Sequence, residues 1–346
     1  MIKVSRSAVV TRKTCPMKRY WAYHAPHPDL PSTGQVGGLT PTTDPSGPAK
    51  ARGSLFHALM EAATNGQDID AAAAAYHDQT LDPTLVALCR RAAKGWRLVR
   101  QEFLVEHTPI SAEVEWEWAV SPYVTQTLRL DQVLRHTATQ ELLILDYKTL
   151  SRPDDNWVYR LWHSDQTHLY IQALVERTHE PVGMQYEGII IGTYDKGVYK
   201  SPFVSGFEKH GTLTPKWAAG ATRIDLTTWT DEAWLAWIQE THGLHDLYCT
   251  TGLIQPTTAA LLATKNATAQ AELQWANTLA VLESAPDEDT RALWRETQIE
   301  KNPDACYKYG RGYACPYVPL CWQGQRPDRE TFSPRDDHHA TAKGSV

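Results

Sequence analysis

The chain has 346 residues, 42% of them hydrophobic, which is enough for one catalytic domain with appended helices or for two domains. It has no apolar run long enough to span a membrane, and its charged N-terminus does not resemble a secretory signal, so we expect a cytoplasmic protein without a membrane partner. The net charge of −6 excludes little, because a chain with this average charge can still carry a local basic patch for a nucleic acid.

The hydrophobic periodicity predicts helices first and then strands. The predicted elements in chain order are a helix starting near 52, a helix over 83–107, strands over 111–120, 124–135 and 141–149, a helix over 159–179, a strand over 184–194, and helices from about 230. A segment over 26–50 that is rich in Pro and Gly is predicted to be a long exposed loop. This order of elements indicates an α/β fold in which helices flank a mixed β-sheet.

Two acids and a lysine stand in adjacent predicted strands. Asp131 lies in the strand over 124–135, and the strand LLILDYK carries Asp146 and Lys148 two positions apart. Side chains alternate across a strand, so Asp146 and Lys148 share one face, and a hairpin through 136–140 would bring Asp131 across from them. A charged residue at a strand end is usually only solvated. Here, however, four apolar residues lead directly into Asp146, and an acid at the edge of a core needs a partner or a metal.

This group of side chains suits the hydrolysis of phosphodiester bonds. Carboxylate oxygens are ligands for Mg²⁺ or Mn²⁺, and such an ion polarises a phosphate and lowers the pKa of a bound water. Lys148 would orient that water or offset the charge that builds on the phosphate. The acids and the lysine therefore predict a metal-dependent nuclease.

The order of four motifs resembles the PD-(D/E)XK nuclease superfamily, in the branch that contains the RecB nuclease domain, the AddB nuclease and Cas4. Members of this branch have G-x-x-x-H on a helix, an acid on a strand, D-x-K at the end of the next strand, and Q-x-x-x-Y on the helix that follows. The matching residues here are Gly53 and His57, Asp131, Asp146 and Lys148, and Gln166 and Tyr170. The resemblance implies a restriction-endonuclease-like core over 51–205 and a deoxyribonuclease activity.

The resemblance also implies roles for the residues in these motifs. His57, Asp131 and Asp146 would bind the divalent ion, and Lys148 would act in catalysis. One position departs from the family pattern, because Leu128 stands three residues before Asp131, where members often have glycine.

The remaining motif residues have competing interpretations. Gln166 and Tyr170 are four residues apart and share a helix face, where they would either contact the substrate or the lysine, or simply pack against the core. Glu115 could add a carboxylate to the metal site. It alternates with Glu113 and Glu117, however, as acids on a solvated strand face do, and we predict that Glu115 is not a ligand.

Four of the six cysteines are candidates for a metal or cluster site. A chain expected in the cytoplasm has little use for disulfides, because cytosolic reductants keep thiols reduced. Cys306, Cys315 and Cys321 fall in one C-terminal segment, and Cys15 is the candidate for a fourth ligand. Four thiolates suit either a [4Fe–4S] cluster or a tetrahedral Zn²⁺ site.

Family placement favours the iron–sulfur cluster over zinc. AddB-like and Cas4-like nucleases hold a [4Fe–4S] cluster with one cysteine before the nuclease core and three after it, where it staples the chain ends over the core. Eight residues separate Cys306 from Cys315, more than is usual in that family, while the C-P-x-x-x-x-C spacing from Cys315 to Cys321 is kept. Cys89 and Cys249 occupy apolar positions of predicted helices and are expected to be buried thiols without a ligand role.

Aromatic and basic side chains crowd both cysteine segments. They are Lys18, Arg19, Tyr20, Trp21, Tyr307, Lys308, Tyr309, Arg311 and Tyr313. Proteins grip single strands by stacking bases on aromatic rings beside positive charge. Simple packing around the cluster would account for most of these residues.

We predict a Mg²⁺- or Mn²⁺-dependent DNA exonuclease that acts on single-stranded DNA or free DNA ends in recombination, repair or phage DNA processing. The alternative is a non-catalytic iron–sulfur DNA-binding subunit, against which the intact acids and lysine argue. A third hypothesis is a nuclease that needs a helicase or integrase partner, because the chain has no helicase P-loop. The predicted segments are 1–25 with the first cluster cysteine, a flexible loop over 26–50, the nuclease core over 51–205, a helical region over 206–300, a cysteine-rich segment over 301–331 and a disordered tail over 332–346.

Overall fold

The computed structural model of the chain divides into two compact units. The residues that the structure describes are 2–25, 39–41, 47–76, 81, 83–150, 156–190, 193–195, 198–200, 230–241, 243–306, 315–323 and 331–334. The larger unit comprises Ser46–Trp116 and Leu128–Lys265. The smaller unit comprises Met1–Pro45, Glu117–Thr127 and Asn266–Val346.

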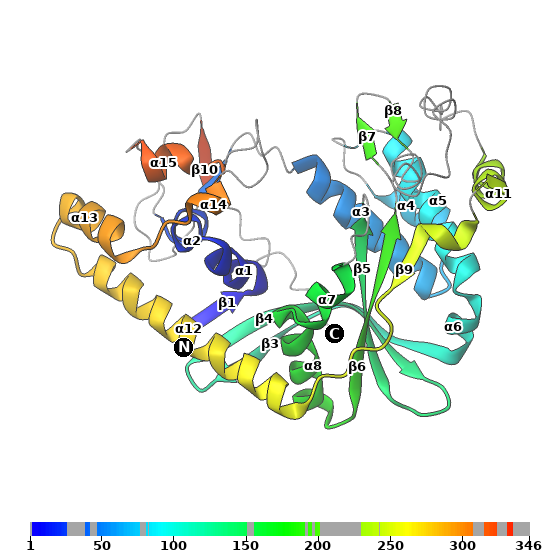
Figure 1. The fold of residues 1–346 in the computed structure, drawn as a ribbon, viewed down its shortest axis with the longest axis horizontal. Coiled ribbons are helices and arrows are strands. Elements are labelled where there is room, and N and C mark those ends of the chain that lie inside the picture. The colour runs from blue at the N-terminus through cyan, green and yellow to red at the C-terminus, as the bar shows by residue number, and fades with distance from the viewer. Residues whose placement is uncertain are drawn as a thin grey trace. The chain divides into compact units, whose positions relative to one another are not determined.

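Runs of helices and runs of strands follow one another along the chain (Figure 1). The strands are β1 (Ile2–Ser5), β2 (Leu39–Pro41), β3 (His107–Ser121), β4 (Val124–His136), β5 (Leu142–Leu150), β6 (Val182–Ile190), β7 (Thr193–Asp195), β8 (Val198–Lys200), β9 (Tyr248–Thr250) and β10 (Phe332–Pro334). The helices are α1 (Arg6–Thr14), α2 (Pro16–Tyr23), α3 (Gly47–Thr64), α4 (Ile69–Ala75), α5 (Pro83–Val99), α6 (Gln101–Glu106), α7 (Trp157–Trp162), α8 (Asp165–Thr178), α11 (Asp231–Thr241), the 3-10 helix η1 (Leu244–Leu247), α12 (Thr258–Glu283), α13 (Glu288–Gln298), α14 (Pro303–Cys306) and α15 (Val318–Trp322). No helix in the described part of the chain is long and apolar enough to cross a lipid bilayer.

A mixed sheet forms the frame of the larger unit, which confirms the predicted α/β fold. β4 and β5 form an antiparallel hairpin, β5 and β6 are parallel, and β6 pairs antiparallel with β9. β3 also pairs with β4, and β1 runs parallel to the first residues of β4 within the smaller unit. Two short pairs, β2 with β10 and β7 with β8, lie outside this sheet.

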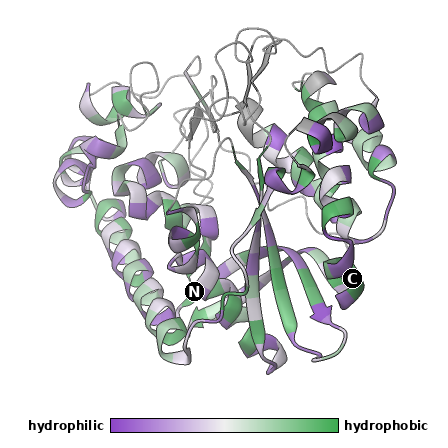
Figure 2. Cartoon of the chain, turned by 45° about the vertical axis from the view of Figure 1, so that its right-hand side comes forward, coloured by the Kyte–Doolittle hydropathy of each residue, from purple (hydrophilic) through white to green (hydrophobic). Residues whose placement is uncertain are grey.

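The central strand β5 separates an apolar face from a functional face. Leu143, Leu145 and Tyr147 belong to the hydrophobic core that α3 and α5 cover. Because side chains alternate along a strand, Asp146 and Lys148 point to the other side, toward α8. Figure 2 shows green, hydrophobic residues along much of the central strands, as expected for strands covered by helices.

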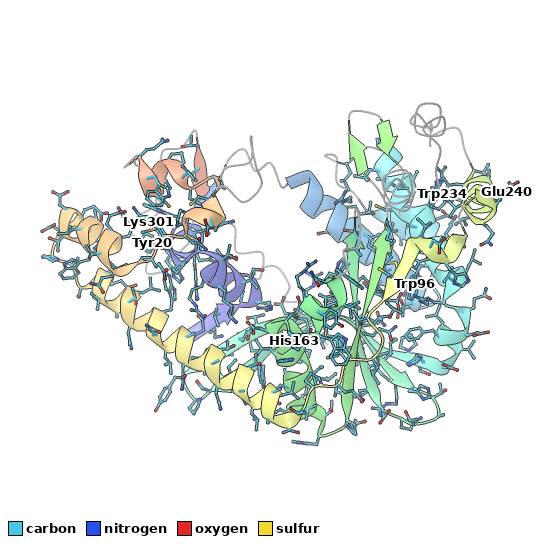
Figure 3. The ribbon with its side chains drawn as sticks, in the orientation of Figure 1. Tyr20, Trp96, His163, Trp234, Glu240 and Lys301 are labelled. Atoms are coloured by element: carbon cyan, nitrogen blue, oxygen red, sulfur yellow. The ribbon has the colours of Figure 1, made fainter. Side chains whose placement is uncertain are left out.

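Tryptophans fill much of the core beside α5 and α11. Trp96 and Trp234, both labelled in Figure 3, are fully buried. The indole nitrogen of Trp96 donates to the buried carboxylate of Glu187 (3.1 Å), and Arg100 binds the same oxygen at 3.0 Å. The buried acid therefore has both a donor and a counter-charge, as burial of a charged group requires.

The smaller unit has its own core, built from α2, α12 and the C-terminal segment. Its core side chains are Cys15, Met17, Tyr20, Trp21, Ala22, Ala25, Trp275, Leu282, Ile299, Tyr317, Leu320, Cys321 and Phe332. The fully buried Glu272 of α12 pairs with Arg19 (2.7 Å) and Arg12 (3.1 Å). Tyr20 and Lys301, labelled in Figure 3, belong to this unit, where Lys301 donates to the carbonyl oxygen of Cys321 (2.6 Å).

The structure corrects several predicted elements. The helix predicted over 159–179 is two helices, because Ser164 accepts a hydrogen bond from the amide of Thr167 and starts a new helix, α8. Cys249 lies in strand β9, not in a helix, and is half-buried. The predicted loop over 26–50 contains β2 and the start of α3, and the predicted tail contains β10.

Some predictions fall on residues outside the described part of the chain. These are the aromatic and basic residues Tyr307, Lys308, Tyr309, Arg311 and Tyr313, the first part of the predicted helical region up to 229, and the predicted disordered tail beyond 334. The predicted segment boundaries remain predictions.

Candidate active site

The β4–β5 hairpin brings the two predicted acids together. Its antiparallel register pairs Gln132 with Leu145, and Asp131 and Asp146 are the next residues along the two strands. The backbone N–H of Tyr147 donates to Oδ2 of Asp131 (3.1 Å), which fixes that carboxylate against β5. Lys148 forms an ion pair with Asp146 Oδ1. The hairpin therefore gathers Asp131, Asp146 and Lys148 at one place, as the alternation of side chains predicted.

Helix α8 holds the second acid from the other side. The amide nitrogen of Gln166 donates to Asp146 Oδ2 (2.9 Å). Tyr170, one turn further along α8, is 5% exposed. The structure thus brings Gln166 to the predicted site and places Tyr170 among the buried residues of α8.

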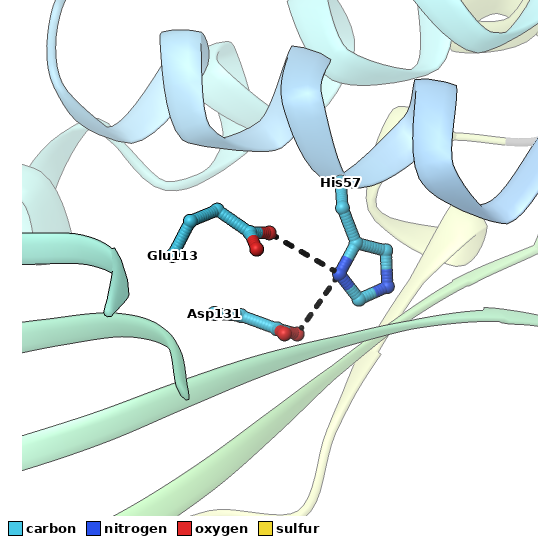
Figure 4. A group of neighbouring side chains, drawn as sticks. All are labelled: His57, Glu113 and Asp131. Carbon is cyan, nitrogen blue, oxygen red and sulfur yellow. Dashed lines mark ion pairs between the residues drawn. The ribbon is translucent and has the colours of Figure 1, made fainter. Parts of the chain in front are cut away.

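Helix α3 and strand β3 complete the site, as Figure 4 shows. Nδ1 of His57 lies 3.2 Å from Asp131 Oδ2 and 4.0 Å from Glu113 Oε1. The ligand atoms of these three side chains all lie within 4.8 Å of one another, so together they could hold a metal ion. Asp146 is not a member of this tight group but borders it through its charge interaction with Asp131.

Glu113 reaches this group because the backbone of β3 is irregular there. Its φ is +48°, in the left-handed region that residues with a Cβ rarely adopt. Such a residue within a strand breaks the regular alternation and redirects its side chain. Arg129 forms an ion pair with Glu113, while Glu115, two residues further along β3, is exposed and outside the group.

The site residues perturb one another's pKa values. Burial and the charge of Asp131 raise the pKa of Asp146 to about 6, although Lys148 opposes this. Burial lowers the pKa of Lys148, but the carboxylates of Asp146 and Asp131 outweigh it, so the net pKa is raised and the ammonium stays protonated. Likewise, burial disfavours a charged His57, yet its hydrogen bond with Asp131 raises the pKa of the imidazole above 6.5. The pKa of each of these three groups therefore depends on the charges of its neighbours as well as on burial.

The donor set fits a hard divalent cation. Oxygen and imidazole nitrogen atoms are the ligands that Mg²⁺ and Mn²⁺ accept, and Glu113, Asp131 and His57 supply them. Oδ1 of Asp146 is buried without a hydrogen bond of good geometry, although Lys148 forms an ion pair with it. This oxygen has lone pairs available and lies beside two further acids. A cation would be stabilised at such a place.

A comparison with protein families identifies the chain. The sequence model of the PD-(D/E)XK nuclease superfamily matches residues 3–322, which is nearly the whole chain. The chain belongs to the PD-(D/E)XK nuclease superfamily. The (D/E)-x-K spacing of this superfamily is that of Asp146 and Lys148. A search of curated proteins finds no relative that matches.

The four candidate ligand cysteines all belong to the smaller unit. Cys15, Cys306 and Cys321 are buried and Cys315 is half-buried, and within the described residues all six cysteines of the chain are free thiols. The N–H of Cys315 donates to the carbonyl of Cys306 (2.8 Å). Burial, followed by the charges of the other three, raises the pKa of Cys321 to about 12. Among the described residues, these four thiols do not form a group whose ligand atoms all lie within 4.8 Å of one another.

The other two cysteines are plain thiols. Cys89 is fully buried in α5, and burial raises the pKa of its thiol to about 12. Cys249 lies 3.5 Å from the carbonyl oxygen of Gly188, and burial and the charge of Glu187 raise its pKa to about 11. Burial therefore disfavours the ionised form of both thiols, and the expectation that neither is a ligand stays a prediction.

Proposed function

We propose that this superfamily member is a divalent-metal-dependent DNA exonuclease of the RecB/AddB/Cas4-like branch. The observation that carries the proposal is the convergence of His57, Glu113 and Asp131 beside the Asp146–Lys148 pair. Hydrolysis of a phosphodiester needs a cation site, a fixed positive charge and positioned carboxylates, and all three are assembled from four separate elements of the larger unit.

Each residue has a distinct proposed role. His57, Glu113 and Asp131, with Asp146 beside them, would hold the divalent ion. The ion would supply Lewis acidity at the scissile phosphate and a water of lowered pKa. Lys148 keeps its proton and offsets the negative charge that builds on the phosphate.

Two neighbours act as positioning residues in this proposal. The amide of Gln166 fixes one oxygen of Asp146, so the other oxygen faces Lys148. The backbone N–H of Tyr147 fixes Asp131 in the same way. A carboxylate held by such contacts loses little freedom when it binds a cation.

The first test is a degradation assay with end-labelled single- and double-stranded DNA. We expect the purified chain to shorten labelled DNA from an end with Mg²⁺ or Mn²⁺, and to leave it intact in EDTA. Closed circular DNA of the same sequence distinguishes attack on ends from internal cutting, and the position of the label gives the polarity. DNA binding without cutting under every metal condition would contradict the proposal and favour a DNA-binding subunit or a nuclease that needs a helicase or integrase partner.

We also propose that Cys15, Cys306, Cys315 and Cys321 bind a [4Fe–4S] cluster. The support is their common place in the smaller unit, where the N–H of Cys315 donates to the carbonyl oxygen of Cys306 (2.8 Å) and Cys315 packs against the core that contains Cys15. Cys15 and Cys321 also share one core, so a cluster would join the first helices to the C-terminal segment. A Zn²⁺ ion is the alternative occupant.

Replacing Cys321 with Ser is expected to remove the cluster. Protein purified without oxygen should contain iron and acid-labile sulfide and absorb visible light, and Cys321→Ser should lose all three, because a hydroxyl is a poor iron ligand. Cys249→Ser is the matched control and should keep wild-type iron content. Zinc without iron in the wild type would overturn the cluster but keep the four-cysteine site, and the absence of both metals would overturn the site itself.

A further inference from the structure

The short helix α7 presents an unusual set of side chains beside the site. Tyr159, Arg160, Trp162 and His163 are all exposed, and Tyr159 has 66% of its surface accessible. Large aromatic side chains are normally placed where they bury their area, so two exposed rings on six residues call for an explanation. His163, at the end of α7, is labelled in Figure 3.

The exposed rings form one face of this helix. At about 100° per residue, Tyr159, Trp162 and His163 fall within roughly 100° of one another on the side opposite Trp157. Trp157 is 7% exposed and anchors the helix. Its ring packs against Gly188, where an added Cβ would lie 3.0 Å from Trp157 Cη2, so the anchor needs a glycine at that position.

This anchor fixes α7 next to the catalytic strand. Gly188 is the residue that pairs with Lys148 in the parallel β5–β6 register. The aromatic face therefore rests on a helix that is packed at the level of Lys148 in the sheet. Side chains that bind DNA bases would need to lie at this level of the sheet if the phosphate of the same DNA strand is held at Lys148.

A second connection runs through α8. The hydroxyl of Thr167 donates to the carbonyl of Leu161 in α7 (2.5 Å) and hydrogen bonds with the hydroxyl of Tyr186 (2.9 Å). The ring of Tyr186 lies under Lys148, with its centroid 5.5 Å from Nζ. Thr167 is fully buried, so these contacts hold α7 rigidly to the site.

We infer that α7 is a platform on which unpaired bases of single-stranded DNA stack, next to the phosphate that is cut. Aromatic rings beside a cation bind single strands without sequence preference, and α7 has Arg160 and no acidic residue. Bases within a duplex are stacked on one another, so only a single strand or a frayed end offers them to Tyr159 and Trp162. The inference rests on the proposed function in one respect, which is that the neighbouring phosphate is cut. The binding of single-stranded DNA by α7 can be tested without that reaction.

Binding measurements in EDTA test the platform separately from cutting. A fluorescein-labelled single-stranded DNA of mixed sequence is titrated with the full chain, and its anisotropy is recorded. Tyr159→Ala combined with Trp162→Ala is expected to weaken binding by about tenfold or more and to affect a blunt duplex much less. The conservative pair Tyr159→Phe and Trp162→Phe keeps the rings and should bind nearly as well as the wild type. Tyr123→Ala removes another exposed tyrosine, 65% accessible, and is the matched control.

A crosslinking measurement on the wild type does not depend on how the variants fold. Single-stranded DNA that contains iododeoxyuridine should crosslink on irradiation to the peptide that carries Tyr159 and Trp162. Crosslinks confined to other segments, or unchanged binding by the double alanine variant, would overturn the platform. Unchanged binding with an altered oligomeric state would do so too, and would make the face a contact between copies of the chain.

The two proposals fail in different ways. If the wild type binds single strands through α7 but cuts no DNA with Mg²⁺ or Mn²⁺, the platform stands and the nuclease proposal is wrong. If the wild type cuts DNA and the double alanine variant cuts single strands and duplexes as the wild type does, the platform is wrong and the nuclease proposal stands.

Discussion

Asp146→Asn is expected to lower DNA cleavage by about a hundred- to a thousandfold while making the metal-free fold more stable. The loss of activity follows because the amide cannot supply the negative oxygen that faces the cation site and Lys148. The gain in stability follows from burial, since Asp146 is 1% exposed and its pKa is raised to about 6. A buried acid that makes the fold less stable is expected at a position where function requires the acid.

The sign of the stability change depends on pH. In the unfolded chain the carboxyl ionises near its ordinary pKa of 3.8, whereas in the fold it holds its proton up to about pH 6. The folded state therefore binds the proton more tightly, and its stability is lost as pH rises from 3.8 through about 6. The difference between these pKa values corresponds to about 3 kcal/mol once both states are ionised.

Urea unfolding in EDTA measures this effect. Near pH 8, Asp146→Asn should have a higher unfolding midpoint than the wild type, and the gap should shrink as pH is lowered toward 4. Glu115→Gln is the matched control, because it removes an exposed carboxylate from the same sheet and should change neither stability nor cleavage much. A variant that cleaves like the wild type would remove Asp146 from the proposed site, and one that is less stable near pH 8 would contradict its costly burial.

The sheet and its two central acids could be predicted because they follow local rules. Alternation in β4 and the apolar run of β5 fixed the hairpin, and its register brings Asp131 next to Asp146 as predicted. The parallel strand β6 could be predicted because it is also a run of mostly apolar residues. β9 was missed because three residues, Tyr248–Thr250, are too few to show a period, although they add a strand to the sheet.

Glu113 could not be predicted from the sequence. Glu113, Glu115 and Glu117 alternate in one strand, so a regular β3 would give all three the same exposure and the same role. What distinguishes Glu113 is its left-handed backbone and the approach of His57 from α3, a contact between residues 56 positions apart (113 − 57). No local pattern encodes such a contact.

The break between α7 and α8 shows a related limit. The sequence predicts one helix over 159–179, because its apolar spacing shows no interruption there. Ser164 interrupts it by capping the next helix, because a serine that accepts from the amide of Thr167 satisfies a helix start better than a helix interior. That break is also what frees α7 to lie beside the catalytic strand instead of continuing α8.

His57 should make Mn²⁺ binding depend on pH near neutrality. A protonated imidazole cannot coordinate a cation, and the hydrogen bond with Asp131 raises the pKa of His57 above 6.5. As pH falls through that raised value, a proton must be displaced for each ion bound at His57. The affinity for Mn²⁺ should then fall by about tenfold per pH unit, and more steeply near pH 6, where Asp146 also gains its proton.

Two variants separate His57 from the carboxylates. His57→Gln should weaken Mn²⁺ binding near pH 8 by about tenfold or more and remove most of the pH dependence between 8 and 6.5, because the group that competes for the proton is gone. Glu113→Gln should weaken binding similarly but keep the pH dependence, since His57 remains. Glu115→Gln should match the wild type in both respects.

Free Mn²⁺ measured by electron paramagnetic resonance gives these affinities without any need for cleavage. A wild-type affinity that does not change between pH 8 and 6 would show that His57 does not touch the ion, and its closeness to Asp131 would then be only an ion pair. If Glu113→Gln and Glu115→Gln bind Mn²⁺ with the same affinity, Glu113 is not a ligand. The left-handed backbone at Glu113 would then serve the fold and not metal binding. Loss of binding in both His57→Gln and Glu113→Gln, with Glu115→Gln unchanged, is the pattern expected of a cation site to which these two side chains contribute from different elements.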